Sequence, residues 1–181
     1  MNDTSIALAL TSLSFMLAVI WGDPLIRVLR YFRIGKLIRV EGPERHMTKM
    51  GTPTMGGVMV LLPVAMLTVL LNATTLLGLR VLGRSVIVPL AVMLGFGLLG
   101  AVDDWEGIRG PRRGLGMRAR TKFLIQTVLA LATAYALYYL LDVPQFFWPG
   151  YDQEIELGLG YIPIAAFIIV GMSNAMNFTD G

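Results

Sequence analysis

Five long apolar stretches constrain the fold more than any other feature of this sequence. Each has roughly 17 or more residues with few charges, which is enough for a helix to cross a hydrocarbon core of about 30 Å. With 55% hydrophobic and 15% charged residues, the chain has more apolar surface than a soluble domain of this length can bury. We therefore predict an all-α integral membrane protein. Residues 1–181 would form one polytopic domain, with spans near 5–22, 55–77, 85–102, 123–141 and 161–177.

The distribution of Lys and Arg predicts how these spans are oriented. The loops after the first and third spans hold every basic residue except Arg80 and Arg84, and the loop after the fourth span holds only acidic charges. The positive-inside rule places both basic loops in the cytoplasm and the N-terminus outside. The net charge of +3 then reflects topology and contact with anionic membrane lipid, and it gives no indication of nucleic-acid binding.

The first polar cluster on the cytoplasmic side is EGPERHMTKMGTPTMGG, residues 41–57. Gly and Pro at this density disfavour a continuous helix and let backbone amides approach a ligand closely. Thr54 and Lys49 can donate hydrogen bonds to an anion there, and His46 is more suited to bracing the loop. The alternative is a loop beside the membrane whose Lys and Arg side chains only reach toward the surface.

The second cluster is the pair Asp103 and Asp104, at the inner end of the third span. A carboxylate at a helix C-terminus opposes the helix dipole, so we expect a cation to compensate for it. Consecutive residues on a helix point about 100° apart, so the two carboxylates should reach different partners. Oxygen ligands, in a chain with no Cys and one His, favour Mg²⁺ over zinc.

The fourth span begins on the same side of the membrane with RARTKFLIQ. A helix N-terminus with free N–H groups, a Thr121 cap and the cations Arg118, Arg120 and Lys122 is a predicted anion site, and phosphate is the expected anion. The alternative is that these cations pair with the carboxylates of the preceding loop.

The third cluster is GMSNAMNFTDG, residues 171–181. If the fifth span continues as a helix, Asn174, Asn177 and Asp180 form one polar stripe. Such stripes in membrane segments face a bundle interior or an aqueous cavity, and their ionisable residues are functional candidates. The alternative is that the Asn side chains only hold neighbouring helices together.

These motifs, in this order and spacing, closely resemble the polyprenyl-phosphate N-acetylhexosamine-1-phosphate transferase superfamily, in its peptidoglycan-synthesis branch. The resemblance covers essentially the whole chain but about half of the family pattern, which has about ten spans. The family's later carboxylate motif, third catalytic Asp and His-rich loop do not occur in this sequence. Relatives also commonly have a Lys shortly after the paired Asp, where this chain continues Trp105-Glu106-Gly107-Ile108.

The resemblance implies transfer of phospho-MurNAc-pentapeptide from its UDP carrier to undecaprenyl phosphate, giving lipid I and UMP with Mg²⁺ as cofactor. The enzyme would lie in the bacterial cytoplasmic membrane with its active site on the cytoplasmic face, and a homodimer is compatible with this. Asp103 and Asp104 would act in catalysis and hold Mg²⁺ together with residues of the family pattern that are absent from this chain, and Lys122 would bind phosphate. The nucleotide-sugar side would be bound by Lys49, Thr54, Asn174, Asn177 and Asp180.

Two other functions remain open from the sequence. One is a sister enzyme that transfers GlcNAc-1-phosphate from UDP-GlcNAc to a polyprenyl phosphate. The other is half of a transporter, but transporter sites lie near the bilayer midplane, whereas these polar residues cluster at the inner ends of spans.

Overall fold

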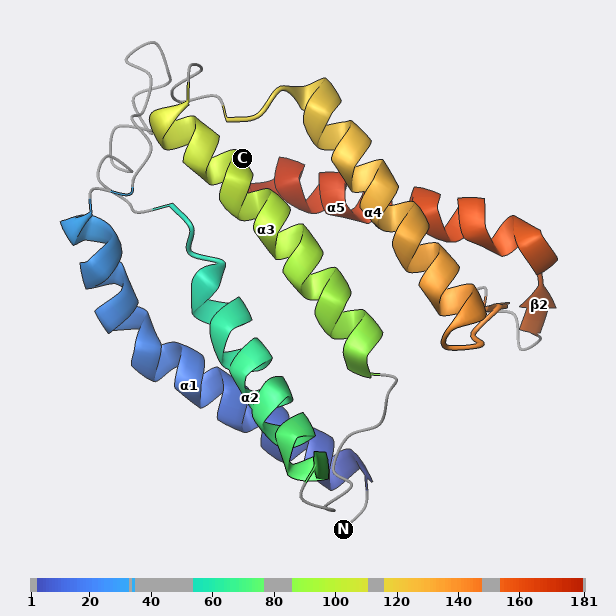
Figure 1. Cartoon of the computed structure of the whole chain (residues 1–181), viewed down its shortest axis with the longest axis horizontal. Helices are drawn as coiled ribbons and strands as arrows, with labels where there is room; N and C mark the ends of the chain where they lie inside the picture. Colours follow the sequence, from blue (N-terminus) through green and yellow to red (C-terminus); the bar gives the residue numbers. More distant parts are fainter. Residues whose placement is uncertain are drawn as a thin grey trace. The chain divides into compact units, whose positions relative to one another are not determined.

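The computed structural model describes residues 3–32, 34, 54–76, 86–110, 116–147 and 154–180, and this part of the chain is mostly helical (Figure 1). The elements, in chain order, are α1 (Asp3–Tyr31), α2 (Val58–Leu76), α3 (Ile87–Arg109), α4 (Ala119–Tyr139), β1 (Gln145–Phe147), β2 (Glu154–Glu156), the short 3₁₀ helix η3 (Gly158–Gly160) and α5 (Tyr161–Asp180). Each predicted span thus corresponds to one α-helix.

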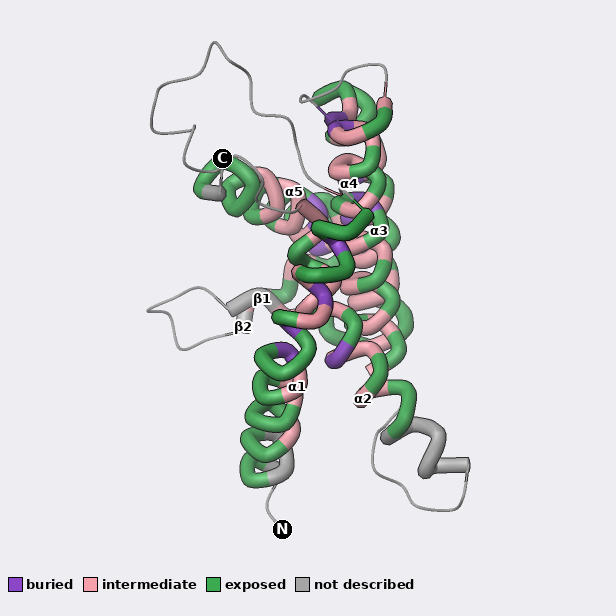
Figure 2. Tube along the Cα trace, turned by 90° about the vertical axis from the view of Figure 1, so that its left-hand side faces the viewer, coloured by how far each residue is buried: buried purple, intermediate pink, exposed green. Residues whose placement is uncertain are grey.

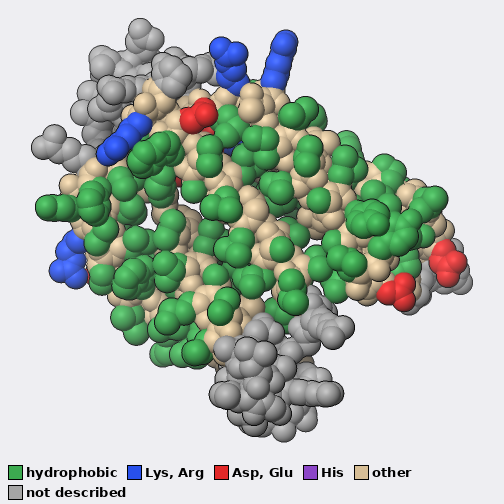
Figure 3. Space-filling model, viewed as in Figure 1, with side chains coloured by type: hydrophobic (Ala, Val, Ile, Leu, Met, Phe, Trp, Pro, Cys, Tyr) green, Lys and Arg blue, Asp and Glu red, His purple; other side chains and the backbone are tan. Residues whose placement is uncertain are grey.

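Length and composition agree with a membrane location. Within the described residues, four helical segments are long and apolar enough to cross a membrane: Leu8–Tyr31, Ile87–Arg109, Ala119–Tyr139 and Gly158–Thr179. A shorter apolar helical segment, Val58–Leu70, lies in α2. Large apolar side chains such as Phe15, Ile20 and Phe167 are exposed, and hydrophobic side chains cover most of the face in Figure 3. These findings confirm the predicted all-α membrane fold class, since such surface requires lipid or further helices to cover it.

Three helices extend beyond their predicted spans on the side of the two basic loops, whereas α2 lies within its predicted span. α1 continues to Tyr31 instead of ending near residue 22, so Arg27 and Arg30 lie in the helix and not in a loop. At the other basic loop, α3 continues to Arg109 and α4 already begins at Ala119. The predicted boundaries were wrong here because Arg and Lys are good helix formers whose long side chains can reach the membrane surface from within a helix.

The chain divides into two compact units, and each is described by itself. The first consists of Met1–Val86 and Gly97–Arg118, and the second of Ile87–Phe96 and Ala119–Gly181. In the first unit α1 packs on α2, with Gly22 close to the side chain of Met59. The prediction of a single polytopic domain stays a prediction.

The second unit is built on the contact between α4 and α5. Ala130 and Ala134 on α4 are fully buried, and Ala166 on α5 is 6% exposed. Small residues at a helix contact let two backbones approach closely. In a membrane this close packing drives helix association, because lipid tails are as apolar as the side chains and the hydrophobic effect gives no driving force. Figure 2 shows that most of the residues it describes are exposed or half-buried.

A two-stranded antiparallel sheet lies between these two helices in the chain and was not predicted. β1 pairs with β2 in the register Gln145 with Glu156, Phe146 with Ile155 and Phe147 with Glu154. The alternation Glu-Ile-Glu and the paired Phe residues are typical of strands, but the segment is short beside the long apolar runs that flank it.

Candidate active site

The two neighbouring carboxylates of α3 each accept a hydrogen bond from a backbone amide of the first unit. The Met117 N–H donates to Asp103 Oδ1 at 2.8 Å, and the Met55 N–H donates to Asp104 Oδ2 at 2.9 Å. Met117 lies just before α4, which begins at Ala119, and Met55 lies just before α2, which begins at Val58. The expectation that the two carboxylates reach different partners is confirmed.

The position of this pair in α3 differs from the one predicted. The helix continues through both carboxylates to Arg109, so they lie more than one turn before its end. The dipole effect on a charge falls off within the last turn, and the argument that these carboxylates oppose the dipole was therefore wrong. The last residue of the helix is a cation, Arg109, whose guanidinium lies 4.9 Å from the ring centroid of Trp105.

Both segments that bind the carboxylates have a residue in the left-handed backbone region. Met55 has φ 66° and Gly116 has φ 67°. This conformation costs an L-residue such as Met55 about 1–2 kcal/mol, and a hydrogen bond to a charged group contributes about 1.5–3 kcal/mol, which offsets the cost. At Gly116 an added Cβ would lie 2.6 Å from Asp103 Oδ1. Gly116 adopts this conformation without strain, whereas a strained non-Gly residue such as Met55 beside a carboxylate is typical of functional sites.

Thr54 directly precedes the strained Met55. Its N–H donates to the carbonyl of Ile34 at 3.1 Å. Its hydroxyl oxygen is buried and has no hydrogen-bond partner among the residues that the structure describes. A buried hydroxyl without a partner costs about 1–3 kcal/mol, so this group is suited to bind an ordered water, ion or ligand. The other candidates of this cluster, His46 and Lys49, lie outside the described residues.

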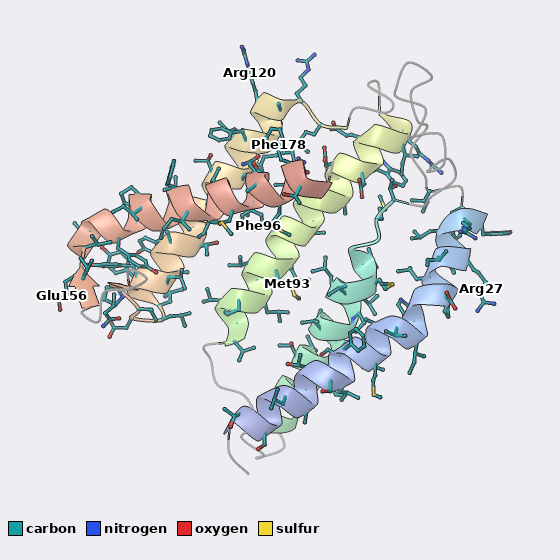
Figure 4. All side chains as sticks on the ribbon, turned by 180° about the vertical axis from the view of Figure 1, so that it is seen from behind. Arg27, Met93, Phe96, Arg120, Glu156 and Phe178 are labelled. Carbon is teal, nitrogen blue, oxygen red and sulfur yellow. The ribbon has the colours of Figure 1, made fainter. Side chains whose placement is uncertain are left out.

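The second unit brings together two further candidates that are far apart in the sequence. Lys122 Nζ on α4 donates to Asn177 Oδ1 on α5 at 3.2 Å, in an exposed position. Figure 4 labels their neighbours Arg120, which projects from the first turn of α4, and Phe178, near the end of α5. The first turn of α4 therefore carries Lys122 beside an amide and a second cation, Arg120, and a helix N-terminus with cations is a suitable environment for an anion. Thr121 lies inside α4, so its predicted role as the helix cap was wrong.

Asn174 is engaged in helix packing. Its Nδ2 donates to Gln126 Oε1 at 3.1 Å and to the carbonyl of Val170 at 2.8 Å. α5 does continue to Asp180, so the helix required for the predicted polar stripe is present. These contacts favour the helix-joining alternative for Asn174, whose assignment to substrate stays a prediction. The side chain of Asp180 lies outside the described part of the structure.

Sequence reasoning missed Gln126, which is 3% exposed. Its Nε2 donates to Ser173 Oγ at 3.3 Å. The available signal was a Gln one helical turn after Lys122 in an otherwise apolar stretch, because an amide in such a position needs a polar partner.

The donor set of α3 fits a hard cation such as Mg²⁺. Among the residues that the structure describes, no group of three or more His, Asp or Glu side chains could hold a metal. Mg²⁺ is usually bound through one or two carboxylates together with water and substrate phosphates, so the chemistry of Asp103 and Asp104 fits a share of such a site. Each carboxylate can accept several bonds, and an amide contact does not prevent metal binding.

Comparisons with known proteins show which proteins this chain is similar to. Curated relatives include the phospho-N-acetylmuramoyl-pentapeptide-transferases of Chloroflexus aggregans, 40% identical over 99% of this chain and 48% of the relative, and of Desulfitobacterium hafniense, 37% identical over 94% of this chain and 49% of the relative. The chain thus spans about half the length of these relatives. Residues 86–181, more than half of the chain, match the model of glycosyl transferase family 4. The chain belongs to glycosyl transferase family 4.

Proposed function

We propose that the complete protein transfers phospho-MurNAc-pentapeptide from its UDP carrier to undecaprenyl phosphate, giving lipid I and UMP in peptidoglycan synthesis. The observation that carries this proposal is the 40% identity to a transferase of that name over 99% of the chain. The same motifs that carry the resemblance contain the two carboxylates that accept the Met117 and Met55 amides.

Asp103 and Asp104 act at the reacting phosphate in this proposal. A rigidly held carboxylate can orient an undecaprenyl phosphate oxygen for attack on the pyrophosphate and can accept a proton from it. The Met117 and Met55 amides fix one oxygen of each carboxylate, and such positioning is most of what phosphoryl transfer requires of a protein. The pair would also hold Mg²⁺, which when bound neutralises negative charge on the phosphates.

Lys122 donates to a phosphate oxygen of the nucleotide substrate. A Lys ammonium group has three donors, so its bond to Asn177 is compatible with a bond to phosphate. Asn177 then serves both to hold this ammonium group and to contact the nucleotide sugar. Lys49, Thr54 and Asp180 contribute to the same substrate, and the buried hydroxyl of Thr54 supports a polar ligand at its position.

The two substrates explain the location we propose for the enzyme. Undecaprenyl phosphate is a membrane lipid, whereas UDP-MurNAc-pentapeptide is soluble, so their reaction requires a site at the membrane surface. The positive-inside rule places the basic loops around these residues in the cytoplasm. The protein would therefore act at the cytoplasmic face of the bacterial cytoplasmic membrane, surrounded by lipid and compatible with a homodimer.

The test is a transfer assay with the complete protein in detergent, undecaprenyl phosphate and Mg²⁺. One reaction receives radiolabelled UDP-MurNAc-pentapeptide and a parallel one receives radiolabelled UDP-GlcNAc. We expect a lipid-extractable product and stoichiometric UMP from the first reaction only. Lipid-linked product from UDP-GlcNAc alone would assign the protein to the sister activity, and no product from either would contradict the proposal.

A further inference from the structure

Among the residues whose burial the structure describes, Gln126 is the polar one that is buried inside a predicted membrane span. It lies on α4, one turn before the buried Ala130, and is 3% exposed. Burying an amide is costly unless its donor and its acceptor both find partners. Both do so here, because Nε2 donates to Ser173 and Oε1 accepts from Asn174.

The face of α4 that meets α5 has a regular order of side chains. Lys122, Gln126, Ala130 and Ala134 follow one another at intervals of four residues, and therefore share one side of the helix. Lys122 meets Asn177, Gln126 meets Ser173 and Asn174, and the two Ala residues pack in the cluster with Ala166. The helices are thus antiparallel, with a polar half at the beginning of α4 and an apolar half beyond it.

The buried amide makes this contact specific for one register. The apolar half consists of small and aliphatic side chains, whose contacts are not directional, so only packing and no hydrogen bond opposes a slide of α5 there. The bond between Lys122 and Asn177 is exposed, and exposed polar pairs are weak because water competes for both groups. If α5 moved by one turn in the direction of its C-terminus, Val170 or its neighbours would lie opposite Gln126 in place of Ser173 and Asn174. The Gln126 amide would then lose its two hydrogen bonds.

We propose that Gln126 is a positioning residue that fixes α5 on α4 in the register at which Asn177 holds the Lys122 ammonium group. The inference rests on the proposed function for its catalytic consequence, and on the hydrogen bonds of the second unit for its structural part. Gln126 acts on the reaction through Lys122 and Asn177 without touching substrate.

The experiment compares Gln126→Leu with Thr127→Val in the complete protein. Gln126→Leu replaces the amide side chain by an apolar one of similar size. Thr127→Val is the matched control, because it also replaces a polar side chain in the same turn of α4, but this hydroxyl bonds only the carbonyl of Phe123 in its own helix among the contacts described. Ser173→Ala removes the acceptor of Gln126 Nε2 from the opposite helix and serves as an independent variant should Gln126→Leu fail to fold.

The first measurement does not depend on activity. Spin labels at Phe123→Cys and Phe178→Cys, two exposed positions at the adjoining ends of α4 and α5, report the distance between the helices by double electron–electron resonance. We expect one narrow distance distribution in the parent and in Thr127→Val, and a broadened or shifted one in Gln126→Leu and Ser173→Ala. An unchanged distribution in both of these variants would overturn the inference.

The second measurement is steady-state turnover per folded molecule. We expect Gln126→Leu to lower kcat/KM by at least about tenfold, mostly through kcat, because misplacing a group near the reacting phosphate is costly. Thr127→Val should retain parental kcat and KM. A purely structural role would reduce the yield of folded protein and leave both constants unchanged, which would contradict the catalytic part. If the parent forms no lipid I, the proposed function fails, and the distance measurement still decides the structural part.

Discussion

Replacing Gly116 by Ala should disrupt the support of Asp103. Gly116 has φ 67°, and an added Cβ would lie 2.6 Å from Asp103 Oδ1 and 3.1 Å from the Asp103 carbonyl oxygen. The left-handed conformation costs Ala about 1–2 kcal/mol. The carboxylate must also move, which breaks the 2.8 Å bond from the Met117 amide, and a hydrogen bond to a charged group contributes about 1.5–3 kcal/mol. Allowing for relaxation of the segment, we expect a local loss of about 2–3 kcal/mol.

Hydrogen exchange of the peptide that contains Met117 measures this loss directly. A change of about 1.4 kcal/mol is tenfold in an equilibrium constant, so the Met117 amide should exchange about 30 to 150 times faster in Gly116→Ala. We also expect turnover of the complete protein to fall at least about tenfold, because Asp103 loses its fixed orientation.

Gly100→Ala is the matched control for this prediction. Gly100 also belongs to the first unit, and a Cβ added there meets nothing within 4 Å. Ala is favoured over Gly inside a helix, so this variant should keep parental exchange and turnover. Gly116→Asn separates the two costs, since Asn tolerates the left-handed region but still carries a Cβ. If Gly116→Ala exchanged and turned over like Gly100→Ala, the contact between Gly116 and Asp103 would have no role in the site.

Two further predictions concern topology and the extent of the active protein. In intact cells, an impermeant thiol reagent should label Gln153→Cys from outside and leave Gly114→Cys unlabelled, if the basic loops face the cytoplasm as we propose. The reverse pattern would contradict a cytoplasmic site. Residues 1–181 alone, purified and folded in detergent, should form no lipid I with both substrates and Mg²⁺, because the chain spans about half the length of its relatives. Loss of a correctly held metal removes several kcal/mol of transition-state stabilisation. Robust product from this segment would contradict the roles assigned above.

The sequence predicted the helices well because their signal is local. A stretch of about 20 apolar residues has few stable alternatives in a membrane, since every backbone polar group must be satisfied within the segment. The ends of α1, α3 and α4 were less predictable, because Arg27, Arg109 and Arg120 do not stop a helix by themselves. The small β1 and β2 pair was missed because its strands are three residues each.

The candidate site shows the same division between local and long-range information. Helix geometry alone predicted that Asp103 and Asp104 reach different partners. It did not reveal the Met117 and Met55 amides, because these contacts join segments 14 and 49 residues apart. For the same reason, Gln126 appeared in the sequence only as the last residue of RTKFLIQ, and its role depends on which residues of α5 lie opposite to it.

The carboxylates of α3 carry the central claim, and their amide variants test it most directly. Asn keeps an oxygen that can accept the Met117 or Met55 amide, so Asp103→Asn and Asp104→Asn should retain parental hydrogen exchange in these segments while losing the charge. We expect turnover of UDP-MurNAc-pentapeptide to fall at least about 100-fold in each variant, the usual scale for a positioned acid–base or electrostatic group. Near-parental turnover in both variants, with the segments still protected, would show that the pair only holds loops in place and would contradict its catalytic role.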